Sequence, residues 1–146
     1  PGGTLAIIDY KTGRSVAPLR WFDPRPQGPQ LPLYLLAHRA AVPAEAVAAL
    51  AYAGVRAGNA RWSGVAANAA AWPDLGSVEA LTQGRIADWA AATDHWRAAL
   101  AALAGEFVAG HAAVLPRSGA CRTCGLQALC RVDAVAGADE TDAADA

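Results

Sequence analysis

Residues 5–13, Leu-Ala-Ile-Ile-Asp-Tyr-Lys-Thr-Gly, organise the rest of this chain. Their apolar beginning predicts a buried strand from Thr4 to Tyr10, and the Thr-Gly pair predicts the turn that ends it. Side chains alternate along a strand, so Asp9 and Lys11 project from the same face. Isolated charges are costly beside a buried strand, which indicates that the pair has a use. The use that fits is a hard divalent cation at the carboxylate and a phosphate near the lysine.

The next informative segment is the helix expected over residues 30–41, which Pro43 stops. Its Pro32 falls in the first turn, where proline is tolerated. Gln30 and Tyr34 are four residues apart and therefore share one face of this helix. The residues expected to face the core are Leu33, Leu36 and Ala37.

These two segments resemble the RecB-like nucleases of the PD-(D/E)XK phosphodiesterase superfamily, in particular the AddB-type nucleases of helicase-nuclease DNA repair complexes. Residues 8–13 match the D-x-K motif of that family, and Gln30 with Tyr34 matches its Q-x-x-x-Y motif. A third match lies in the cysteine segment, residues 116–132. It consists of Cys121, Cys124 and Cys130 followed by Arg131, and is preceded by Phe107, Gly110 and Pro116. The resemblance extends over about residues 4–131.

The resemblance implies an α/β fold of the restriction-endonuclease-like type, with a mixed central sheet flanked by helices. Residues 1–132 would be the C-terminal portion of the nuclease domain, and its core would be N-terminally truncated. The family pattern includes an upstream acid, so we expect this chain alone to have weak or no activity although its parent would cleave DNA. Residues 133–146 hold five of the 13 acids and are expected to form an acidic disordered tail.

The same resemblance implies a role for each motif residue in a Mg²⁺-dependent deoxyribonuclease of exonuclease type. Asp9 and the backbone carbonyl of Tyr10 would hold Mg²⁺ or Mn²⁺. Lys11 would position or activate the attacking water. Gln30 would hold the lysine or a phosphate oxygen, and Tyr34 would support it from the next turn. The catalytic set implied is therefore Asp9, Lys11, Gln30 and Tyr34.

Charge and composition are compatible with DNA as the partner. The net charge is −1, but residues 1–132 carry 12 basic against eight acidic residues, a net of +4. Lys11 is the only lysine among the basic residues, which indicates that its position needs a compact point charge. Residues 14–29 are proline-rich and are predicted to be irregular. Their arginines and aromatics suit DNA contacts through Arg14, Arg20 and Arg25, and a plain surface connector is the alternative.

The cysteines form a C-x2-C-x5-C pattern, and their odd number excludes a closed disulfide framework. Three soft ligands so close together suit a metal. The resemblance implies a [4Fe-4S] cluster in the full-length parent, whose fourth cysteine would lie outside this chain. A zinc site completed by His111 and a metal-free fragment are the alternatives.

Between these motifs, residues 46–56 suit either a helix or a strand, and the resemblance favours a strand that joins the sheet beside the first. Residues 60–66 suit a second short strand or an extended segment, and residues 67–82 are expected to be a linker. Residues 83–110 predict one long helix, because large apolar residues recur at steps of three and four. Its apolar stripe is expected to pack in the core and comprises Ile86, Trp89, Thr93, Trp96, Leu100, Leu103, Phe107 and Gly110.

The leading interpretation is a metal-dependent nuclease domain that works with a helicase in DNA repair and recombination. A catalytically inactive structural or DNA-scanning subunit is the alternative. A small zinc or iron-sulfur interaction module is a third reading, and its folding would depend on metal. The chain lacks a membrane span and a signal sequence, so a cytoplasmic location is expected. An exposed edge at residues 4–10 would invite a homodimer.

Overall fold

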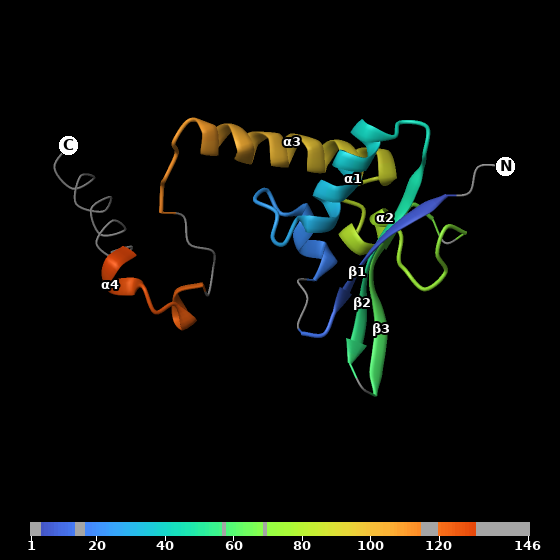
Figure 1. Ribbon diagram of the computed structural model, residues 1–146, viewed down its shortest axis with the longest axis horizontal. Helices are drawn as coiled ribbons and strands as arrows, with labels where there is room; N and C mark the ends of the chain where they lie inside the picture. Colours follow the sequence, from blue (N-terminus) through green and yellow to red (C-terminus); the bar gives the residue numbers. More distant parts are fainter. Residues whose placement is uncertain (1–3, 14–16, 57, 69, 115–119, 131–146) are drawn as a thin grey trace. The chain divides into compact units, whose positions relative to one another are not determined.

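The computed structural model describes residues 4–13, 17–56, 58–68, 70–114 and 120–130 (Figure 1). The chain divides into two units, Pro1–Glu106 and Phe107–Ala146. The first unit contains the sheet and the helices that pack on it. The second contains the cysteine segment. None of the described helices is both long and apolar enough to cross a membrane.

The sheet of the first unit has three strands in the order β1-β2-β3. Strand β1 (Leu5–Lys11) pairs in parallel with β2 (Val47–Arg56), and β2 pairs in antiparallel fashion with β3 (Asn59–Ala66). Helix α1 (Gln30–Ala41) lies between the two parallel strands in the sequence, as a parallel connection requires. The predicted α/β fold with a mixed sheet and flanking helices is confirmed.

The prediction that residues 4–10 form a buried strand is wrong in part, because β1 is an edge strand. Its exposed side chains include Leu5, Ile8 and Tyr10, of which Tyr10 is 70% exposed. The buried strand is instead the central strand β2, where residues 47–53 are all buried. An apolar run alone cannot tell an edge strand from a central one, because the neighbours on each side are supplied by distant parts of the chain.

Each face of the sheet is covered by its own cluster of buried residues. One face carries the larger side chains of β2 and β3, and its buried cluster includes Leu50, Tyr52, Val65, Leu31, Leu35, Trp21, Phe22 and Trp96. The opposite face is lined by small residues and is covered from the segment after β3, with Ala49, Ala51, Ala66 and Leu75 forming its core. The alanines of β2 therefore allow close packing on one face while the larger residues fill the other.

Helix α1 has the predicted bounds, but its buried face differs from the prediction. Leu31, Pro32 and Leu35 are buried, whereas Leu33 is 51% exposed and Ala37 is exposed. The residues at positions 31 and 35 share a face by the helical period, and that face meets the sheet. Leu36 is half-buried and packs against the core, as predicted. The prediction is wrong for Leu33 and Ala37, because leucine occupies both faces of this helix.

The proline-rich segment is more regular than predicted. Pro18–Phe22 forms a short 3-10 helix, η1, which begins with Pro18. Trp21 is fully buried and Phe22 nearly so. Trp21 meets Tyr52 edge-on at 5.5 Å between ring centroids, and Phe22 lies 5.1 Å from the Trp96 ring. The prediction that these aromatics lie on a DNA-contacting loop is therefore wrong, since their burial contributes to the core.

The long helix predicted over residues 83–110 is shorter, and the linker predicted over 67–82 is not wholly irregular. Helix α2 (Val78–Thr82) is capped by Ser77, whose Oγ accepts a hydrogen bond from the Ala80 backbone N–H at 3.2 Å. Gln83 then has a left-handed φ of 55° and Gly84 a φ of 77°, which ends α2. Helix α3 begins only at Trp89 and runs to Val108.

The apolar stripe of α3 is buried over part of its length. Ala92, Thr93 and Trp96 are buried, as the period predicts. Further along, Phe107 is 84% exposed and Gly110 lies beyond the helix with a φ of 75°. The prediction that the whole stripe packs in the core is wrong at this end, because periodicity reports a helix face and not what covers it.

The second unit contains the end of α3, the 3-10 helix η2 (Ala120–Thr123) and the short helix α4 (Gln127–Cys130). Pro116, Arg131 and the predicted acidic tail over residues 133–146 lie outside the described residues.

Gly64 is required by the close approach of β3 to β2. A Cβ at this position would overlap the Leu50 carbonyl oxygen and lie 2.7 Å from the Ala51 Cα. We expect Gly64→Ala to lower the free energy of unfolding by about 3 kcal/mol, because backbone atoms must move to make room. Gly76→Ala is the matched control, since no atom lies within 4 Å of its added carbon. Urea unfolding checks both variants, and equal stability of the two would contradict this account of β2–β3 packing.

Candidate active site at the end of β1

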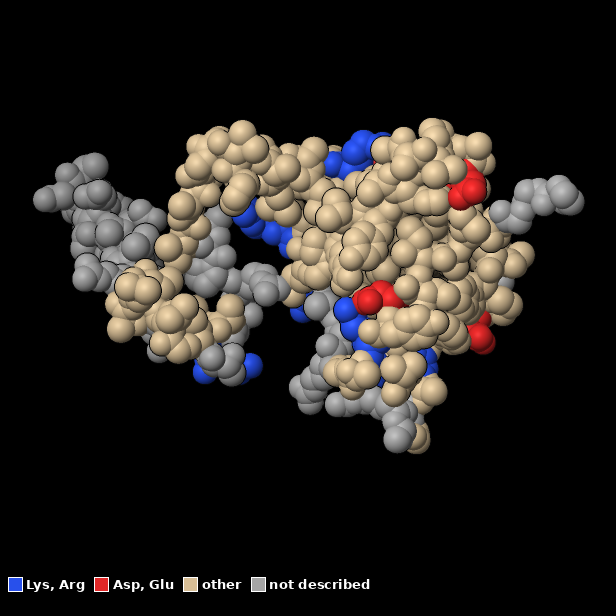
Figure 2. Space-filling model, in the orientation of Figure 1, with Lys and Arg blue, Asp and Glu red and all other residues tan. Residues whose placement is uncertain are grey.

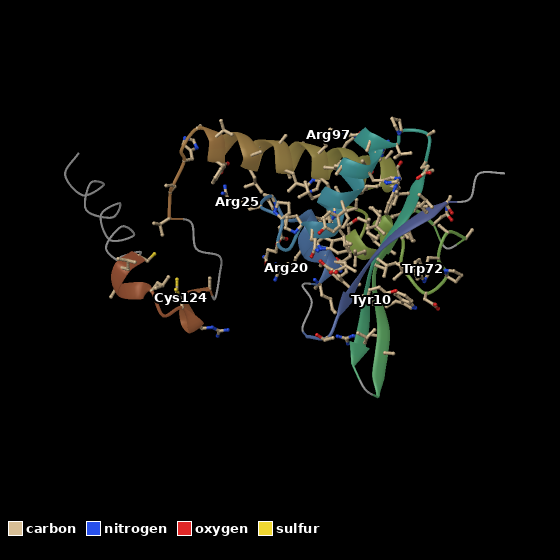
Figure 3. The ribbon with its side chains drawn as sticks, in the orientation of Figure 1. Tyr10, Arg20, Arg25, Trp72, Arg97 and Cys124 are labelled. Carbon is tan, nitrogen blue, oxygen red and sulfur yellow. The ribbon has the colours of Figure 1, made fainter. Side chains whose placement is uncertain are left out.

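The predicted D-x-K residues lie on one face at the C-terminal end of β1. Asp9 pairs with Tyr52 of β2, and Lys11 pairs with Gly54. Paired residues of neighbouring strands point to the same face, so this end of the sheet presents Asp9 and Lys11 toward the first turn of α1. Tyr10 projects to the opposite face, in the row of Ala53 (Figure 3). Strand alternation alone therefore separates the charged pair from the tyrosine between them.

Asp9 and Lys11 form a short, partly buried ion pair. Lys11 Nζ lies 2.5 Å from Asp9 Oδ2, and the side chains are 31% and 23% exposed, respectively. The close hydrogen-bonding contact with the Asp9 carboxylate raises the pKa of Lys11 above the ordinary 10.5, although burial opposes the rise. Lys11 is therefore an ammonium ion at neutral pH. It can attract a phosphate or orient a water, but it cannot accept a proton there.

Gln30 and Tyr34 extend this pair into a hydrogen-bonded chain. Lys11 Nζ donates to Gln30 Oε1 at 3.4 Å, and Gln30 Nε2 donates to Tyr34 Oη at 3.0 Å. The second contact spans one helical turn, as the spacing of four residues requires. The structure thus brings together all four residues of the predicted catalytic set, which come from two separate elements.

Tyr52 is a member of this site that the sequence did not reveal. The Lys11 ammonium lies 5.1 Å from the centre of the Tyr52 ring, within the range of a cation–π contact. The Tyr52 hydroxyl donates to the Gly28 carbonyl at 3.3 Å, and burial raises the pKa of this phenol, so it stays neutral. The sequence showed an aromatic residue on a predicted strand, but it did not show that this residue pairs with Asp9.

Asp9 is suited to hold one side of a divalent cation. Its Oδ2 is buried and, apart from the ion pair with Lys11, receives no hydrogen bond from the described residues. Mg²⁺ accepts one or two carboxylates and keeps several waters, so a single buried carboxylate fits as one ligand. Across the described ranges, no three His, Cys, Asp or Glu residues gather as a metal-binding group. Tyr10 could contribute only through its backbone, because its side chain faces away.

The arginines predicted to bind DNA are exposed but paired. Arg20 Nη1 lies 3.6 Å from Asp23 Oδ2, and Arg25 Nη1 lies 2.7 Å from Glu106 Oε2. Their side chains are 58% and 52% exposed, so each pair is open to solvent. Such exposed pairs are weak and can be exchanged for a phosphate. Figure 3 labels both arginines in the part of the first unit around η1. Arg14 lies outside the described residues.

The cysteines of the second unit do not converge on one point among the described residues. Cys124 is exposed and is labelled in Figure 3, while Cys121 and Cys130 are half-buried. The Leu126 backbone N–H donates to Cys124 Sγ at 3.4 Å. The proposed zinc ligand His111 is exposed. The ligand types suit a soft metal, but the described geometry does not assemble them into a site.

The pKa of Lys11 provides a direct test of the ion pair. Because it is raised on folding, the stability that the pair contributes is complete at neutral pH and is lost as the pH rises past 10.5. Asp9→Asn removes the carboxylate, and we expect the pKa of Lys11 to fall toward 10.5. Lysine labelled with ¹³C at Cε gives one NMR signal to titrate, since the chain has one lysine. Asp23→Asn is the control, and a wild-type pKa at or below 10.5 would contradict the pair.

Comparison with known proteins agrees with this geometry. The sequence matches the model of the PD-(D/E)XK nuclease superfamily over residues 1–131. No curated protein and no solved structure matches the chain. The family match covers the strand end, the first turn of α1 and the cysteine segment, and nucleases of this superfamily generally use divalent metal ions. The chain therefore belongs to the PD-(D/E)XK nuclease superfamily.

Proposed function

We propose that this chain is the metal-binding and lysine-bearing part of a Mg²⁺- or Mn²⁺-dependent DNA nuclease. The observation that carries the proposal is the chain of contacts from Asp9 through Lys11 and Gln30 to Tyr34. A carboxylate that can ligate a cation beside a charged ammonium supplies two of the groups that metal-dependent phosphodiester hydrolysis uses.

Each residue has a distinct task in the proposed reaction. Asp9 ligates the cation, which supplies a water of lowered pKa and neutralises charge on the phosphate when it is bound. Lys11 is held charged, so it stabilises the negative charge that develops on the phosphate oxygens. Gln30 accepts from Lys11 and donates to Tyr34, which limits the rotation of both side chains. The Tyr52 ring makes a cation–π contact with the Lys11 ammonium and so helps to hold it in place.

The finer assignments rest on the motif resemblance. We propose that the chain belongs to a RecB-like, AddB-type nuclease that works with a helicase in DNA repair and recombination. This nuclease would act in the cytoplasm and would cleave DNA as an exonuclease. Arg20 and Arg25 would exchange their exposed acidic partners for DNA phosphates. The outer edge of β1, which pairs with no described strand, would accept another strand, for example that of a second copy.

An inactive DNA-scanning subunit is the second candidate, and one observation favours it. Asp9 is the only carboxylate that the described contacts bring to Lys11, whereas Asp23 and Glu45 are engaged with Arg20 and His38. A site with one carboxylate can bind DNA and metal weakly without cleaving. The two candidates therefore differ in turnover and share the binding surface.

Metal binding by calorimetry tests the proposal. We expect Mn²⁺ to bind the wild-type chain, and Asp9→Asn to weaken binding at least tenfold because it removes the only anionic ligand that the described site offers. Asp74→Asn is the control, since this exposed acid has no described role at the site. Unchanged binding in Asp9→Asn would overturn the assignment of Asp9.

Cleavage of labelled single-stranded DNA by the full-length parent then separates the two candidates, because this chain alone is expected to have weak or no activity. A nuclease loses about 100-fold or more of its rate in Lys11→Ala, because the charge on the phosphate is no longer balanced. Metal and DNA binding without any cleavage, in wild type and Lys11→Ala alike, would favour the scanning subunit.

We also propose that the cysteine segment holds a [4Fe-4S] cluster in the assembled protein. Its support is the C-x2-C-x5-C spacing and the partial exposure of all three thiols, which leaves them accessible to a cluster. Anaerobic purification of the full-length parent should give a protein that contains iron and acid-labile sulfide, and Cys124→Ser should lower both. Zinc without sulfide in the purified protein would replace the cluster with a zinc site.

A further inference from the structure

We propose that Arg61 of β3 binds a phosphate of the DNA strand next to the one that reacts at Lys11. The inference rests on the proposed function and extends the site to an element that carries none of its motifs. Three observations point to Arg61: its register, the space over Gly54, and its lack of a described ionic partner.

Register places Arg61 in the same row as Lys11. Lys11 pairs with Gly54 of β2, and Gly54 pairs with Arg61 of β3. Residues paired across neighbouring strands point to one face of the sheet, so Lys11 and Arg61 share a face. Two strand spacings separate their Cα atoms by roughly 10 Å. Both side chains are long enough to extend into the space between them.

Gly54 leaves that space open. A Cβ at Gly54 would lie 3.3 Å from the Arg61 carbonyl oxygen and 3.5 Å from the Arg61 Cγ, so the beginning of the arginine side chain lies beside the glycine. Gly54 adds no side chain of its own between the two basic residues. A larger residue at position 54 would stand between them.

Arg61 has no described acidic partner. It is exposed, and its side chain makes no ion pair or hydrogen bond with the described residues of 4–130. Arg20, Arg25 and Arg97 each have a carboxylate within 4.0 Å. Figure 2 shows blue atoms at several points around the lower part of the sheet, where Figure 1 places the end of β1 and the β2–β3 hairpin.

The chemistry of this position selects a phosphate. The guanidinium offers a planar fork of donors that matches two phosphate oxygens, whereas Lys11 provides a point charge. An anion carrying several phosphates in a row can satisfy both at once. A nucleic-acid strand has this spacing of charge along its length, while a single carboxylate ligand would meet only one of the two cations. Arg61 is thus a substrate-binding residue that would set how the strand crosses the sheet.

The test measures DNA binding without divalent metal, by fluorescence anisotropy of labelled oligothymidylate in EDTA at several salt concentrations. We expect Arg61→Ala to weaken binding several-fold and to reduce the slope of log K against log salt by about 0.7, the value for one phosphate contact on a single strand. Arg61→Lys should keep most of the slope. Arg97→Ala is the control, because it removes the same charge from helix α3, outside the row formed by Lys11, Gly54 and Arg61.

The outcomes separate this inference from the proposed function. An unchanged slope in Arg61→Ala, with a reduced slope in Lys11→Ala, would overturn the role of Arg61 and leave the nuclease site intact. An equal loss in Arg97→Ala would also overturn it, since overall charge would then explain the effect. A wild-type chain that binds Mn²⁺ through Asp9 but no DNA would overturn both proposals. Circular dichroism melting confirms that each variant is folded.

Discussion

The parallel pairing of β1 with β2 is the constraint on which the rest of this structure depends. It sets Asp9 beside Tyr52 and Lys11 beside Gly54. A shift of one residue would turn Asp9 and Lys11 to the other face of the sheet, away from α1. Tyr52, the hydrogen bond to Gln30 and the row that ends at Arg61 would be lost together. The register is held by the large buried residues of one face, with Leu50 and Val65 among them, and by the small residues of the other.

The aromatic core supports the site without touching a substrate. Trp21 packs edge-on against Tyr52 and Trp96, so η1 and α3 are joined to the strand that carries the site. The Tyr52 hydroxyl also ties β2 to Gly28, just before α1 begins. The proline-rich segment is therefore packed between the sheet and helix α3 through Trp21 and Phe22. Burying Trp21 and Phe22 explains why an otherwise irregular segment adopts one conformation.

The core of the first unit is formed wholly by residues that precede the cysteine segment. A module whose folding depended on metal would be organised around its cysteines instead.

The charges at the site differ in how far they are exposed to solvent. The Asp9 side chain is 23% exposed and the Lys11 side chain 31% exposed, and Arg61 is exposed. In the proposed DNA site, a strand would therefore meet the two cations before the carboxylate.

The sequence by itself determined the strand and the helix that carry the motifs and the four motif residues, but not η1, α2 or the start of α3. Alternation made Asp9 and Lys11 share a face, and a spacing of four made Gln30 and Tyr34 share another, because both periods are properties of the backbone. Only the tertiary structure decided which strand is central, which face of α1 is buried, that Trp21 and Phe22 are core residues, and that Tyr52 and Arg61 lie in rows with the motif. These facts depend on register and packing between segments far apart in the sequence, for example Lys11 with Gly54 and Trp21 with Trp96. No local pattern reports such contacts, because the partner that buries or pairs a residue is chosen by the whole core.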